Sequence, residues 1–393
     1  MLNSDIYIMI PVGGVISESL FTNSKKDEIF DSYVEKLMQT SLYECDNKVS
    51  KALTRVNYGN AYISYYDSDN YDESVKQWIL CNIVYTYCKN TNLGILQLII
   101  GNCDKEDSQI GDIISSNHLS IKVNNNEYKL DEFLNKVSLN QYGKIRTINC
   151  NSINKKDKTM KYTLIAETAN SEYNPHQISD SYFEKVGSDD FSKYNFYELY
   201  VDEKTVVYLL KDFSNRYEEN IDAEILLIFI CEIAIFQNAA VSRINIKIID
   251  ELLENSNISS RKSLKLQVEY GKTILFWNNN VFNYHVAQDL SNDIVNAFKT
   301  KELMDEYKKN SKHLEQIANL KSGITANIEA KILNTLAFIL SMSQLFEIIK
   351  NIRNILIGKE WQIGIISSSV ILAIVIIALI RNRQINQKNK TNK

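Results

Sequence analysis

The chain has 393 residues, of which 45% are hydrophobic and 23% are charged, and its net charge is −4. This length allows one or two domains with a hydrophobic core. The small net charge argues against a protein that binds nucleic acid through a basic surface, and we expect no direct nucleic-acid partner. The sequence contains no recognisable nucleophile motif, glycine-rich phosphate loop or His/Cys metal-ligand spacing, so we expect that it is not an enzyme.

Residues 1–215 predict a mixed domain of the α+β or α/β class. The whole chain has only two prolines and 12 glycines, which favours regular strands and long helices over loops. Short apolar runs predict strands, and longer runs with helical spacing predict helices. The predicted strands are 6–10, 61–65, 78–87, 95–100, 145–150, 162–167 and 206–210, and the predicted helices are 27–40 and 130–137. Six cysteines without paired spacing are typical of a reducing, cytoplasmic compartment.

Residues 216–331 predict a helical connector. Its first helix, 222–255, is apolar enough to resemble a membrane span. Four polar residues interrupt it, so we interpret it as a buried helix of a cytoplasmic domain. These residues are Glu224, Glu232, Gln237 and Asn238. Residues 260–277 predict a second helix that packs back on the first.

A long stalk helix is predicted from residue 289 to 331. This segment contains no proline and one glycine, Gly323, and its apolar residues recur at helical spacing. Continued through the next apolar run, the helix would have about 60 residues and a length near 90 Å. A helix of this length needs a partner along its surface, and copies of itself in a homo-oligomer are the simplest partner.

Two apolar runs near the C-terminus predict a membrane hairpin, residues 332–380. Residues 363–380 carry no charge over about 27 Å of helix and are followed at once by Arg381 and Arg383. Residues 332–349 are more polar, and hydropathy alone fits a core helix and a span equally well. A hairpin keeps both the N-terminal domain and the basic tail, 381–393, on the cytoplasmic side, as the positive-inside rule favours. We therefore expect a multi-pass protein of the inner (plasma) membrane with both termini in the cytoplasm.

The first predicted span carries a stripe of polar residues. Asn334, Ser341 and Gln344 fall within an arc of about 80° on a helix. Such a stripe faces protein or water rather than lipid. Two interpretations stay open: hydrogen bonds between packed helices, or the lining of a pore built by several copies of this helix.

The order of these elements resembles the CorA superfamily of magnesium transporters. The similarity is best from about residue 224 to 383 and includes the segments EYGKTILFW at 269–277 and NIEAKILNTLAFI at 327–339. The resemblance implies a homopentamer in which the first span lines the pore and the second faces lipid. It also implies a cytoplasmic domain that controls opening.

The sequence departs from this family at the outer end of the first span. The family carries a Gly-Met-Asn triplet there, whereas residues 346–351 read Phe-Glu-Ile-Ile-Lys-Asn, with Asn351 as the one matching residue type. The predicted outer loop, 350–362, holds three basic residues and one acidic residue, a charge of +2 per chain and +10 around a five-fold mouth. These residues are Lys350, Arg353, Lys359 and Glu360. A positive mouth repels divalent cations, which argues against housekeeping uptake of Mg²⁺.

CorA-like proteins without the triplet also occur beside type III CRISPR systems, where they resemble membrane effectors opened by a nucleotide second messenger. The resemblance therefore favours a nucleotide-responsive antiviral channel. An anionic messenger would need arginine ligands, and the candidates are Arg146, Arg216 and Arg243. Two alternatives stay open: a transporter of divalent cations (Mg²⁺ or Co²⁺), and a membrane-anchored scaffold that does not conduct ions.

Overall fold

The structure is a computed structural model, and it divides into two compact units, Met1–Asn319 and Leu320–Lys393. The residues that the structure describes are 5–21, 24–66, 76–101, 119–152, 181, 185, 189–195, 197–210, 217–254, 260–277 and 281–356. The predicted strand 162–167, the predicted second span and the basic tail lie outside these residues.

The first unit is built on a mixed sheet in which the described strands number ten. Their order is β6-β5-β2-β3-β4-β1-β8-β10-β9, and β7 pairs separately with β1. Neighbouring strands run antiparallel, except that β10 lies parallel to β8. The strands are β1 (Asp5–Gly13), β2 (Leu53–Tyr66), β3 (Lys76–Cys88), β4 (Leu93–Ile100), β5 (Ser120–Val123), β6 (Asn126–Lys129), β7 (Asn140–Gln141), β8 (Arg146–Ser152), β9 (Tyr197–Val201) and β10 (Thr205–Leu210).

Both faces of the sheet are covered, and this explains why β1 is buried at all nine positions. Tyr7 and Met9 point into one core, whereas Ile6, Ile8 and Ile10 point into the other. This alternation follows from the two-residue period of a strand. A central strand with two covered faces therefore appears in the sequence as an unbroken apolar run.

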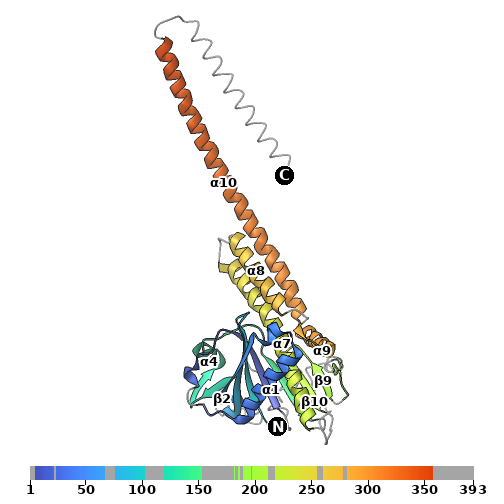
Figure 1. The fold of residues 1–393 in the computed structure, drawn as a ribbon. Helices are drawn as coiled ribbons and strands as arrows, with labels where there is room; N and C mark the ends of the chain where they lie inside the picture. Colours follow the sequence, from blue (N-terminus) through green and yellow to red (C-terminus); the bar gives the residue numbers. More distant parts are fainter. Residues whose placement is uncertain are drawn as a thin grey trace. The chain divides into compact units, whose positions relative to one another are not determined.

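Helices from distant parts of the chain cover the first face (Figure 1). These are α1 (Glu28–Glu44), α7 (Tyr217–Glu254) and α9 (His285–Ala297), whose apolar residues share one core with the sheet. The short helices η1 (Glu18–Leu20) and α4 (Leu130–Lys136) lie on the other face. The Asp27 side chain caps the N-terminus of α1, where it accepts a hydrogen bond from the Ile29 amide.

The C-terminal half of α7 leaves the sheet and packs against two further helices, α8 (Ser260–Phe276) and α10 (Thr300–Leu356). Val241, Ile244 and Ile248 of α7 meet Tyr307 and Leu314 of α10 in a small core of their own. The predictions of a buried helix at 222–255 and of a second helix packed against it are confirmed.

The prediction of one uninterrupted helix from residue 289 was wrong. The chain breaks between α9 and α10, where Lys299 adopts a φ of 55°. Buried Asn238 of α7 stabilises this corner, because its amide donates to the Phe298 carbonyl (3.1 Å) and to Thr300 Oγ1 (3.0 Å). The Phe298 side chain is buried, so the corner is held by packing as well as by hydrogen bonds.

Candidate functional site

Two helical segments among the described residues are long and apolar enough to cross a membrane, judged by length and composition: Asp222–Leu253 and Ala326–Ile349. The most apolar part of the first is 94% buried inside the domain, as expected for a core helix. The corresponding part of the second has no buried share at all. An exposed apolar surface of this size marks a contact with lipid or with protein.

The predicted polar stripe lies on this exposed segment of α10. Asn334, Ser341 and Gln344 are all exposed in the single chain. The Ser341 hydroxyl donates to the Ala337 carbonyl (2.7 Å), so its proton is satisfied within its own helix. The side-chain amides of Asn334 and Gln344 have a greater need of an external polar partner, because each carries donors and an acceptor.

The predicted outer loop was expected to begin at residue 350, but the helix continues through Lys350, Asn351 and Arg353 and ends at Leu356. Residues 350–356 contain neither glycine nor proline, so nothing in the local sequence ends the helix. The side chains of these three outer-mouth candidates lie outside the described part.

Two of the three predicted anion ligands are buried in the first unit. Arg146 donates to the Lys144 carbonyl (2.8 Å) and stacks on the Phe298 ring at 4.6 Å, and burial lowers its pKa to about 10. Arg243 donates to the Thr91 carbonyl at 2.8 Å and lies 3.6 Å from a carboxylate oxygen of Glu269. Arg216 lies outside the described residues. A role in phosphate binding stays a prediction for all three.

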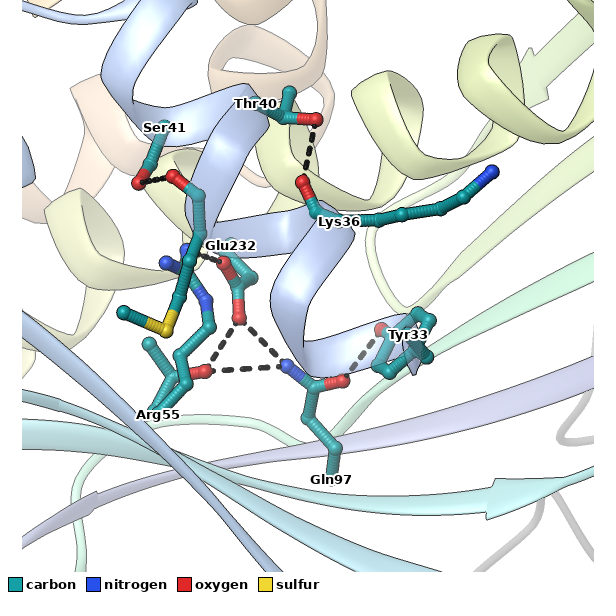
Figure 2. Close-up of polar contacts among 9 residues, drawn as sticks. Tyr33, Lys36, Thr40, Ser41, Arg55, Gln97 and Glu232 are labelled. Atoms are coloured by element: carbon teal, nitrogen blue, oxygen red, sulfur yellow. Dashed lines mark hydrogen bonds and ion pairs between the residues drawn. The ribbon is translucent and has the colours of Figure 1, made fainter. Parts of the chain in front are cut away.

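A buried polar network centred on Glu232 joins α7 to the sheet and to α1 (Figure 2). Glu232 accepts hydrogen bonds from Arg55 on β2, Thr86 on β3 and Gln97 on β4, each at 2.6 Å. The Tyr33 hydroxyl of α1 donates to the Gln97 side-chain oxygen at 2.9 Å. Three strands therefore meet α7 at one carboxylate, and α1 joins the network through Gln97.

This network contains a fully buried ion pair, because the side chains of Arg55 and Glu232 are both 0% exposed. Arg55 also lies 5.5 Å from the Phe229 ring centroid. Removing two charges from water costs several kcal/mol per ion, so such a pair contributes little net stability but strongly penalises any arrangement that separates it. We interpret the pair as the contact that fixes the position of α7 on the sheet.

A second buried carboxylate, Glu224, lies two turns earlier on α7. It accepts a hydrogen bond of 2.8 Å from the Tyr7 hydroxyl. Burial and the nearby Asp5 carboxylate raise its pKa from 4.5 to about 7, against the smaller lowering effect of hydrogen bonds from Tyr7 and Cys150. The five cysteines that the structure describes, Cys150 among them, are buried and free.

Glu224 makes the stability of the first unit depend on pH. Its folded-state pKa lies above its unfolded value, so stabilisation is complete below pH 4.5 and is lost as the pH rises through 7. The loss is about 3 kcal/mol.

Glu224→Gln keeps an acceptor for Tyr7 without the charge, and we expect it to be more stable than the wild type at pH 8 and equally stable at pH 4.5. Denaturant unfolding between these values, with Glu35→Gln on the surface of α1 as the control, measures the difference. Parallel pH curves for Glu224→Gln and wild type would contradict the assignment.

Another face of α7 contacts the start of α10. Beyond Glu232, Asn238 binds the corner at residues 298–300, and Asn245 donates to the Leu303 carbonyl at 3.1 Å. One helix thus carries polar contacts to the sheet and to the first turns of α10. A displacement of α7 on the sheet would therefore be transmitted to the start of α10.

No protein-family model, curated protein or solved structure matches this chain. Within the described ranges there is no group of three or more His, Cys, Asp or Glu side chains that could hold a metal ion. The exposed helix and the contacts of α7 are therefore the features of the described residues that bear on function.

Proposed function

We propose that this chain forms a homo-oligomeric membrane channel whose N-terminal domain controls its opening. The observation that carries the proposal is the exposed segment Ala326–Ile349, of which no part is buried in the chain. Ten large apolar side chains are exposed between residues 332 and 349. Their removal from water is favourable by an amount on the order of 10 kcal/mol, which a lipid bilayer supplies.

Self-association is supported by a second apolar stripe on α10, which begins before the span and continues into it. Its members recur at intervals of three or four residues and are between 37% and 68% exposed: Ile317, Leu320, Ile324, Ile328 and Ile332. Side chains at this spacing lie on one face of a helix, so a copy of the same helix is a suitable partner. In the channel the Asn334, Ser341 and Gln344 stripe faces the axis.

Control by the N-terminal domain is supported by α7, which binds both the sheet and the first turns of α10. In the specific form of the proposal, the channel is CorA-like, with both termini cytoplasmic, and it responds to a nucleotide messenger in type III CRISPR defence. The alternative is a transporter of Mg²⁺ or Co²⁺. The positive residues Lys350 and Arg353 favour the first form, since they repel divalent cations.

A membrane-anchored scaffold is the second candidate, and it is favoured by one observation. The Ser341 hydroxyl is already satisfied by its own helix, so this side chain does not require water. In the scaffold the two amides of the stripe hydrogen-bond between packed helices instead of lining a pore.

Ion flux into liposomes that contain the purified full-length chain tests the proposal. The channel is expected to conduct in at least one of three conditions: added nucleotide messenger, depleted Mg²⁺ or added Mg²⁺. Flux on adding the nucleotide alone supports the antiviral form, and flux that follows Mg²⁺ supports the transporter. Absence of flux in all three conditions refutes the channel and leaves the scaffold.

Membrane topology is tested separately with reporters fused before Met1 and after Lys393. We expect both reporters to report the cytoplasmic side, because the hairpin crosses the bilayer twice. Reporters on opposite sides would contradict the hairpin whatever the flux assay gives.

A further inference from the structure

A cavity of about 840 Å³ lies in the first unit. Five elements contribute to its walls: α1, the N-terminal end of α7, the start of α9, and strands β9 and β10. Cavities of 300–1,000 Å³ are typical of small-molecule sites. The residues that line it come from widely separated parts of the chain, so the fold builds this site.

Tyrosine is the most frequent residue type in the lining. Tyr194, Tyr197 and Tyr208 form a row along one wall, with ring centroids 6.2 Å and 4.8 Å apart, and Tyr43 and Tyr284 also line the cavity. Tyr208 is fully buried, and its hydroxyl has no hydrogen-bond partner among the described residues. The tyrosines of the lining therefore offer a ligand an aromatic wall.

Among the described residues, the charged side chains of the lining are one lysine and two carboxylates, Lys36, Glu44 and Asp222. Lys36 is paired with Asp222 at 3.3 Å. The other carboxylate is Glu44, and burial raises its pKa, an effect that a bound cation would offset. The described part of the wall therefore carries more negative than positive charge, which favours a positively charged ligand.

We infer that this cavity binds a small organic cation, an ammonium group on an apolar body. The aromatic wall surrounds the apolar body and attracts the positive charge through the ring faces. The Glu44 carboxylate supplies the counter-charge. This site does not require the chain to conduct ions, so its test is independent of the flux assay.

Three probes of one shape and different charge test this inference: 2-phenylethylammonium, 2-phenylethanol and phenylacetate. Binding to the full-length chain in detergent is measured by calorimetry. The ammonium is expected to bind with a Kd of about 1 mM, as suits a ligand of this size. The alcohol should bind about tenfold more weakly and the carboxylate more weakly still. The inference is overturned if phenylacetate binds as tightly as the ammonium, or if the ammonium shows no saturable binding up to about 10 mM.

Variants at exposed lining positions separate the site from general stability. Tyr43→Leu removes one aromatic ring from the lining at an exposed position, so the protein should remain as stable as wild type while ammonium affinity falls about threefold. Glu44→Gln should bring the ammonium and alcohol affinities close together. Tyr62→Leu, on an exposed residue of β2 outside the cavity, is the matched control and should change neither. Unchanged affinity in both cavity variants would place the cation elsewhere.

Discussion

Replacing Glu232 with alanine is expected to destabilise the first unit by about 3–5 kcal/mol, because it leaves the Arg55 guanidinium buried without a counter-charge. The same change removes the carboxylate that accepts hydrogen bonds from Thr86 on β3 and Gln97 on β4. Thermal or denaturant unfolding of the full chain in detergent, followed by circular dichroism, measures the loss. Few single substitutions reach this size, so the effect should be clear.

Two further variants show whether the charge or the volume matters. Glu35→Ala makes the same substitution at an exposed position of α1 and should change stability by less than about 0.5 kcal/mol. The double variant Arg55→Met/Glu232→Leu replaces both charges with apolar groups and should recover much of the loss. If the double variant were as unstable as Glu232→Ala, packing rather than charge would explain the network.

Local sequence patterns predicted much of the sheet, and the reason is visible in the central strands. In β4, residues such as Leu96 and Leu98 face one core while Ile95 and Ile99 face the other. An apolar run that is buried on both faces leaves little choice but a central strand. The buried helix α7 was predicted from a long apolar run whose few polar residues do not suit a bilayer.

Contacts between residues that are distant in the sequence could not be predicted from local patterns. The break at Lys299 carries no glycine or proline, and it depends on an amide 61 residues earlier, Asn238. Glu232 was noticed in the sequence only as an interruption of an apolar helix. Its three partners, on β2, β3 and β4, become neighbours only when the register of these strands is fixed.

The cavity illustrates the same limit. Its tyrosines come from α1, β9, β10 and nearby connections, and in the sequence they are part of a general abundance of 23 tyrosines. Only the fold distinguishes Tyr208, whose hydroxyl is buried without a partner among the described residues, from Tyr62, which is exposed. The arginines predicted as ligands, Arg146 and Arg243, lie outside the lining of this cavity, and their described contacts are internal.

Replacing Ser341 with leucine is expected to lower ion flux by about tenfold or more, under whichever condition opens the wild-type channel. The change adds an apolar side chain to the stripe that we assign to the pore axis, and an apolar constriction excludes water. A tenfold loss corresponds to only about 1.4 kcal/mol in the barrier. Asn334→Leu should act in the same direction, because it removes an amide from the same face.

The matched control is Ser343→Leu, which makes the same chemical change two residues away. At 100° per residue, Ser343 lies about 160° around the helix from Ser341 and faces away from the proposed axis. Its flux should stay within about twofold of wild type, and cross-linking should give the same oligomer for all variants. A difference between the two serines requires a helix whose two sides meet different surroundings, one of them aqueous. Equal flux in Ser341→Leu and Ser343→Leu would mean that the stripe does not line a pore, and it would favour the scaffold, in which these residues serve only helix packing.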